Sequence, residues 1–266
     1  MADKFIKYRN KNLFYRSIGS GKAVVLLHGF GEDGNIWNSI IEVLKDDFNL
    51  IVPDIPGSGK SEMLEGKDIL LDDYAEAVKN ILNNERISSC AFIGHSMGGY
   101  IALAFAHNYP ELINALGLFH STAFADEEEK KQTRLKAIEF IKKNGAHAFL
   151  KTAIPNLFSE KSQTHFYKEI DLLIENGKSF SDEALIEYYT AMINRNDTTE
   201  ILKTLNKPVL FISGELDKAV PLQATLQQCH LPTISHIHIL EDVGHMSMIE
   251  NKKESTDDLQ FFLRNI

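Results

Sequence analysis

The chain has 266 residues, of which 44% are hydrophobic and 24% charged, and its formal net charge is −9 at pH 7. This composition is that of a globular domain and excludes disordered and fibrous chains. The acidic balance argues against nucleic acid or an anionic membrane as the main partner, but it says nothing about the reaction. The oligomeric state stays open.

Targeting signals and disulfides are not indicated by the sequence. The two cysteines, Cys90 and Cys229, are too few for a disulfide framework or a cysteine-based metal site. The first eight residues are polar and alternating, unlike a signal peptide, and no apolar run reaches the length of a membrane span. We therefore expect a cytoplasmic protein.

Short apolar runs in chain order predict the strands. Two alternating runs, 5–8 and 13–18, predict an antiparallel pair. Six nearly continuous runs follow at 23–27, 50–52, 90–93, 115–119, 209–212 and 237–240, with helical patterns between them at 36–44, 74–82, 100–107 and 222–228. This alternation predicts an α/β fold with a doubly wound, mostly parallel eight-stranded sheet, whose ligands bind outside the carboxyl ends of the strands.

The alternation is interrupted at residues 121–197, which predicts a helical cap inserted between two parts of the core, 1–120 and 198–266. The cap opens on the charged run 126–131, which is typical of a solvated helix N-terminus. Most of its many aromatic residues should pack the cap against the core. A minority should face a ligand, and the candidates are Phe149, Phe158 and Tyr189.

A serine lies between a predicted strand and a predicted helix, where residues 94–98 read Gly-His-Ser-Met-Gly. A sharp turn between these two elements lifts the hydroxyl above the sheet, where a base and a substrate can reach it. The flanking glycines allow the turn to pack closely. Ser96 is therefore the predicted nucleophile.

A serine hydroxyl needs a base to activate it and an acid to orient that base. Asp217 follows the predicted strand 209–212, and His245 follows the strand 237–240, so both lie in loops at carboxyl ends of strands. Glu215 and Asp242 are alternative acids. Chain order and loop position favour Asp217.

The chain resembles the α/β-hydrolase fold superfamily over essentially its whole length. Besides the serine turn and the acid and histidine loops, the resemblance includes His-Gly-Phe-Gly at 28–31 and Asp-Ile-Pro-Gly-Ser-Gly-Lys-Ser at 54–61. It implies that Ser96, Asp217 and His245 form a catalytic triad and that the backbone N–H groups of Phe30 and Met97 form the oxyanion hole. The chain lacks the HGGG-type loop of some lipases, which favours cap-bearing hydrolases of small molecules.

Other histidines near the predicted site have less certain roles. His28 and His95 should brace loops, and His120, after the strand 115–119, is a candidate substrate-binding residue. His236 and His238 share a strand face, but no third ligand follows from the spacing, so no metal is expected.

These features predict a hydrolase that cleaves an ester or lactone through an acyl-enzyme without metal or organic cofactor. A serine triad also serves thioesterases, carbon–carbon bond hydrolases and lyases, which the sequence does not separate. A second hypothesis is a ligand receptor on a hydrolase fold with little turnover.

Overall fold

Eight strands form one sheet in the computed structural model, which describes residues 2–266. Their order across the sheet is β1-β2-β4-β3-β5-β6-β7-β8. The strands are β1 (Ala2–Tyr8), β2 (Lys11–Ile18), β3 (Lys22–Leu27), β4 (Phe48–Pro53), β5 (Cys90–His95), β6 (Ile113–Phe119), β7 (Val209–Gly214) and β8 (Ser235–Leu240).

The strand directions confirm the predicted mixed sheet. β2 pairs antiparallel with β1 and with β4, and all pairs from β4 to β8 are parallel. Every residue of the central strand β5 is buried, because helices cover both faces of the sheet. The edge strand β8 instead exposes alternate residues, among them Ile237 and Ile239.

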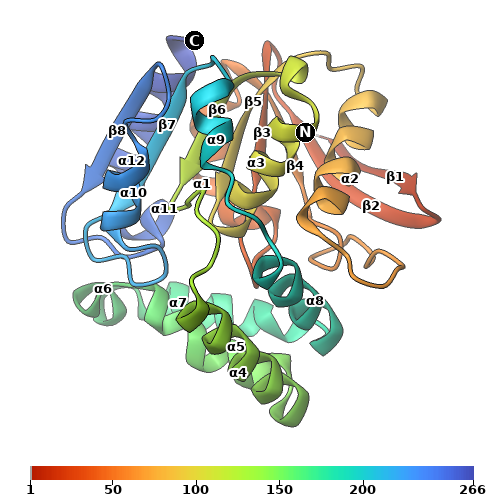
Figure 1. The fold of residues 1–266 in the computed structure, drawn as a ribbon, viewed down its shortest axis with the longest axis vertical. Coiled ribbons are helices and arrows are strands. Elements are labelled where there is room, and N and C mark those ends of the chain that lie inside the picture. The colour runs from red at the N-terminus through yellow and green to blue at the C-terminus, as the bar shows by residue number, and fades with distance from the viewer. Residues whose placement is uncertain (1) are drawn as a thin grey trace.

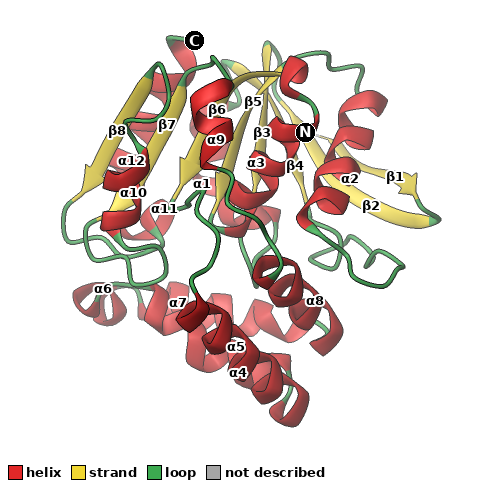
Figure 2. Ribbon diagram, viewed as in Figure 1, coloured by secondary structure: helices red, strands yellow, loops and turns green. Residues whose placement is uncertain are grey.

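Helices lie on both faces of the sheet and beyond one edge (Figures 1 and 2). The α-helices are α1 (Asn38–Leu44), α2 (Leu71–Asn84), α3 (Met97–Asn108), α4 (Glu128–Asn144), α5 (Ala146–Ala153), α6 (Glu160–His165), α7 (Tyr167–Asn176), α8 (Asp182–Ile193), α9 (Thr199–Thr204), α10 (Leu222–Gln228), α11 (Ser247–Glu250) and α12 (Lys252–Arg264). Short 3-10 turns are η1 (Gly34–Trp37), η2 (Pro110–Leu112), η3 (Ile154–Leu157) and η4 (Gly177–Ser179).

One helix prediction needs correction, and one helix was missed. The segment predicted as one helix at 36–44 is the turn η1 followed by α1, and the side chain of Asp33 accepts the Asn35 N–H at its start. The helix α12 was not predicted. Its apolar stripe of Leu259, Phe262 and Leu263 is buried against the core, but it lies among charged residues.

The insertion between β6 and β7 contains α4–α9. Figure 1 shows α4–α8 as a separate layer beyond the carboxyl ends of the parallel strands, whereas α9 lies beside α3 on the core. We call α4–α8 the cap. The Tyr188 hydroxyl in α8 donates a 2.8 Å hydrogen bond to the Pro56 carbonyl oxygen, which ties the cap to the core. No helix within residues 2–266 is long and apolar enough to cross a membrane.

Candidate active site

Ser96 occupies a sharp turn between β5 and α3, as the sequence predicts. Its backbone has φ 51° and ψ −115°, a conformation that residues with a side chain rarely adopt. Close packing holds the turn, because a Cβ on Gly98 would lie 2.5 Å from the Leu27 carbonyl oxygen. On Gly94 a Cβ would lie 2.3 Å from the backbone of Gly98. Neither position has room for a side chain.

Asp217 accepts four hydrogen bonds in the loop after β7. Its Oδ2 atom lies 2.7 Å from Nδ1 of His245 and 3.1 Å from Nδ1 of His120. Its Oδ1 atom accepts the N–H groups of Ala219 and Val220, both at 2.8 Å. The two backbone N–H groups are donors, and each imidazole donates as well in the tautomer that carries its proton on Nδ1, so the carboxylate is matched to its ionised form. The Gly214 N–H also lies 3.3 Å from Nδ1 of His120.

Charge and burial act in opposite directions on this carboxylate. Burial would raise the pKa of Asp217, but the His245 charge and the hydrogen bonds from both imidazoles outweigh it and hold that pKa well below its usual range. Burial lowers the pKa of His120 to about 4, so its ring is neutral at pH 7. His120 therefore gives Asp217 a hydrogen bond without a charge.

The other two candidate acids do not lie at His245. Glu215 is exposed, and its Oε2 atom accepts the Asp242 N–H at 3.3 Å. Asp242 forms an exposed ion pair with Lys161 at 3.3 Å. Of the three acids that the sequence leaves open, Asp217 is the one that hydrogen-bonds His245.

His95 and Glu32 form a buried pair behind the serine turn. His95 Nδ1 lies 2.9 Å from Glu32 Oε2, and its Nε2 lies 3.1 Å from the His245 carbonyl oxygen. Burial opposes both charges, yet the Glu32 charge raises the pKa of His95 and the His95 charge lowers that of Glu32. The pair thus links the loop after β3 to the backbone of the histidine loop.

His28 braces a second pair of loops. Its Nε2 atom accepts the Ile55 N–H at 2.9 Å, and its Nδ1 atom lies 2.8 Å from the Gly29 carbonyl oxygen, to which it donates. These contacts join the loop after β3 to the loop after β4. His28 and His95 therefore occupy the bracing positions that the sequence predicts.

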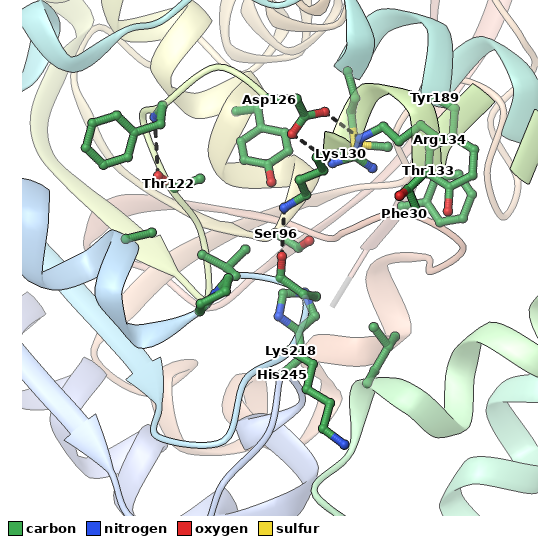
Figure 3. A pocket seen from close by; sticks show the side chains of 18 of the residues that line it. Phe30, Ser96, Thr122, Asp126, Lys130, Thr133, Arg134, Tyr189, Lys218 and His245 are labelled. Carbon is green, nitrogen blue, oxygen red and sulfur yellow. Dashed lines mark hydrogen bonds and ion pairs between the residues drawn. The ribbon is translucent and has the colours of Figure 1, made fainter. Parts of the chain in front are cut away.

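A cavity of about 1220 Å³ lies between the core loops and the cap. Ser96 and His245 line it, as do Phe30 and Tyr189 (Figure 3). Phe149 also lines it. The rings of Phe30 and Tyr189 stack at 4.2 Å between centroids. The two cap aromatics thus form one apolar wall with the loop after β3. The cavity is large enough to hold a small molecule.

Two predicted substrate-binding residues lie elsewhere. His120 and Phe158 do not line the cavity, and their exposed fractions are 0% and 1%. His120 is turned toward Asp217, and the backbone at Phe158 packs against Gly244 in the histidine loop. These contacts are structural, and neither residue is part of the cavity lining.

One wall of the cavity is charged, which was not predicted from the sequence. Asp126, read as part of a solvated helix start, is 6% exposed, and it pairs with Arg134 at 2.6 Å and Arg195 at 3.0 Å. Lys130 lies in the same wall. Lys130 and Arg134 follow Asp126 at helical spacing, and this spacing could have indicated that the three residues lie close together. Arg195 follows α8, and no sequence pattern connects it with Asp126.

Within residues 2–266, one group of three or more potential metal ligands converges, namely His120, Asp217 and His245, with ligand atoms within 4.8 Å of one another. Their hydrogen bonds account for this proximity. His236 and His238 are not in such a group. His236 packs on Phe262 at 5.1 Å between ring centroids, and His238 Nδ1 lies 3.0 Å from Asp258.

Comparison with known proteins identifies relatives of this fold and site. One relative, from Bacillus subtilis, is 30% identical over 259 residues, which cover 93% of this chain and 92% of the relative. It is named as a 2-succinyl-6-hydroxy-2,4-cyclohexadiene-1-carboxylate synthase. The pimeloyl-(acyl-carrier protein) methyl ester esterase of Aeromonas salmonicida is 27% identical over 251 residues, covering 92% and 96%.

A solved structure shows the same fold. A thermophilic esterase from Thermogutta terrifontis, with malate bound, superimposes with a TM-score of 0.92 at 26% identity over 100% of this chain and 99% of its own. The family model of the alpha/beta hydrolase fold matches residues 22–252. The chain therefore belongs to the alpha/beta hydrolase fold family.

Proposed function

We propose that this protein is a serine hydrolase that cleaves small-molecule carboxylic esters, including cyclic esters (lactones). The observation that carries the proposal is the hydrogen bond from His245 to the buried Asp217, because His245 and Ser96 line the same cavity. Two of the relatives are named as esterases, which supports the same reaction class.

The mechanism follows from these positions. Ser96 Oγ attacks the carbonyl carbon while His245 Nε2 takes the serine proton, and Asp217 holds the proton on Nδ1. The leaving alkoxide then takes the proton from His245 as the carbon–oxygen bond breaks. Water attacks the acyl-enzyme with His245 as base, which releases the carboxylic acid and restores the serine.

The oxyanion of each tetrahedral intermediate would be held by the N–H groups of Phe30 and Met97. Among the hydrogen bonds of residues 2–266, neither group donates to a protein acceptor, so both are available. Met97 is the first residue of α3, where the helix dipole also favours negative charge.

A fluorophosphonate probe tests the nucleophile directly. We expect the probe to label Ser96, with Ser96→Ala removing both the label and the hydrolysis of p-nitrophenyl butyrate. Ser121→Ala is the matched control, because the Ser121 hydroxyl only donates to the Ser96 carbonyl oxygen at 2.8 Å. A label that mapped to another serine, or that survived Ser96→Ala, would overturn the assignment.

A lyase reaction is the second candidate, because the Bacillus subtilis relative is named as a synthase. Both reactions could use the same base. They differ in water: hydrolysis in H₂¹⁸O places one ¹⁸O atom in the acid product, whereas elimination incorporates none. Mass spectrometry of the product therefore decides between the two.

A further inference from the structure

Two arginines pair with a single buried carboxylate in the cavity wall, and a lysine lines the same wall. Arg134 donates through Nε to Asp126 at 2.6 Å, and Arg195 Nη2 lies 3.0 Å from the other Asp126 oxygen. Lys130, one turn before Arg134 in α4, also lines the cavity. Figure 3 shows Lys130 beside this ion pair, extended toward Ser96.

The charges of this wall do not cancel. Burial would raise the pKa of Asp126, but its hydrogen bond to Arg134 and the charges of both arginines outweigh burial and lower that pKa, so the carboxylate is ionised. Three positive charges therefore face one negative charge. The other acids that line the cavity are Glu127, Glu129 and Asp197, which are exposed to screening by water, and Glu32, which pairs with His95.

Tyr100 lies against the same wall. Its ring centroid lies 3.9 Å from the Arg195 guanidinium carbon. The Tyr100 side chain is buried and lines the cavity. Burial alone would raise the pKa of Tyr100, yet the charges of Arg195, Lys130 and Arg134 lower it. The cations of this wall thus lie close enough to Tyr100 to act on its hydroxyl group.

Holding the fold accounts for the arginines but not for Lys130. Arg195 also donates to the carbonyl oxygens of Met192 and Phe124, so it joins the cap to the core. Lys130 Nζ donates to the neutral carbonyl oxygen of Ala219 at 2.8 Å, and this bond leaves two ammonium protons for other acceptors. Its charge has no carboxylate partner within residues 2–266.

Lys130 is also held close to the reacting groups. Ala219, which accepts its proton, donates its own N–H to Asp217 at 2.8 Å. The ammonium is therefore anchored to the loop that carries the proposed catalytic acid. A substrate group bound there would lie in the same cavity as the ester carbonyl at Ser96.

We propose that the cavity selects esters that carry an anionic group, a carboxylate or a phosphonate, and that Lys130 is the residue that binds it. The inference rests on the proposed function for the position of the scissile ester. Arg134 and Arg195 add to the attraction but stay paired with Asp126. Phe149 and Tyr189 would contact the apolar part between the two ends of the substrate.

Binding measured without turnover tests this selectivity. In the Ser96→Ala protein, ligand-observed NMR titration compares monomethyl adipate with dimethyl adipate, which differ in one charge. A charged hydrogen bond of this kind should give the monoester about tenfold tighter binding. Methyl 4-phosphonobutyrate serves as the phosphonate probe, and the tighter binder of the two anions identifies the preferred group.

Variants of Lys130 then locate the contact. Adding Lys130→Met should abolish the preference and leave the affinity for the diester within about twofold, whereas Lys130→Arg should keep most of the preference. Lys136→Met is the matched control, because Lys136 is exposed on the same helix and does not line the cavity.

Equal affinity for the two methyl esters would overturn the inference, and so would a preference that survives Lys130→Met. Turnover by the wild-type enzyme is measured separately. If the enzyme hydrolyses neither ester but Ser96→Ala still prefers the anion, the proposed function fails and the anion site stands. If the wild-type enzyme hydrolyses both esters but Ser96→Ala binds them equally well, the proposed function stands and the anion site fails.

Discussion

Asp217→Asn should lower kcat strongly with only a modest loss of stability. All four groups that contact this carboxylate are donors: the N–H groups of Ala219 and Val220 at one oxygen, and Nδ1 of His245 and of His120 at the other. An amide has one accepting atom and one donating atom. Its oxygen can satisfy one pair of donors, and its NH₂ group then faces the other pair.

The better orientation keeps the two backbone N–H groups on the amide oxygen. The NH₂ group then faces His245 and favours the tautomer with a bare Nδ1 and a protonated Nε2, which cannot take the serine proton. The equivalent substitution in a serine protease lowers kcat by about 10⁴-fold, or about 5.5 kcal/mol of activation free energy, and we expect the same order here.

Stability should change much less. The amide replaces charge-assisted hydrogen bonds, worth about 1.5–3 kcal/mol each, with neutral ones worth about 1 kcal/mol. Since the new tautomer restores one contact, we expect a loss of about 2 kcal/mol, which corresponds to about 4–8 °C in Tm for a chain of this size.

The assay is the steady-state hydrolysis of p-nitrophenyl butyrate, with Tm measured on the same samples. Glu215→Gln is the matched control, because Glu215 is exposed in the same loop and should keep nearly full kcat. The reasoning is refuted if folded Asp217→Asn retains more than a tenth of the wild-type kcat, or if Glu215→Gln is the more damaging change.

Three further predictions concern packing, selectivity and pH. Gly98→Ala should destabilise the fold or prevent soluble expression, since its Cβ would lie 2.5 Å from a backbone oxygen; a wild-type Tm would contradict this. Tyr189→Ala, in the cavity wall, should change the ratio of kcat/KM between p-nitrophenyl butyrate and octanoate, whereas Phe158→Ala should lower Tm by a core cavity without changing that ratio. The pKa of His120 is lowered from 6.5 to about 4 in the folded state, so unfolding takes up a proton between pH 4 and 6.5. The neutral ring therefore contributes about 3 kcal/mol to the free energy of unfolding above pH 6.5, and this contribution is lost as the pH falls toward 4. His120→Asn, which tolerates the φ of 51° at this position, should remove this part of the acid destabilisation in chemical unfolding curves, and an unchanged pH dependence would count against a neutral His120.

Local pattern and chain order were enough to predict the sheet and the loops that carry the candidate site. The runs of β3 to β7 are nearly continuous and apolar because parallel strands are buried on both faces, whereas the edge strand β8 is not. In such a sheet the carboxyl ends of the strands share one edge, so a motif that follows a strand is placed by topology alone. Ser96, Asp217 and His245 each follow a strand in this way, and two of them are in contact.

The positions of the cap side chains were decided only by the tertiary structure. Phe149 lines the cavity and Phe158 does not, although both are aromatic residues of one helical segment, because the direction of a side chain depends on how each helix rests on the core. Asp126 is charged and near a helix start, which is the local pattern of a solvated residue. Its burial depends on Arg195, a partner that the chain brings back only after α8, and a pairing between distant residues leaves no periodic signal in sequence.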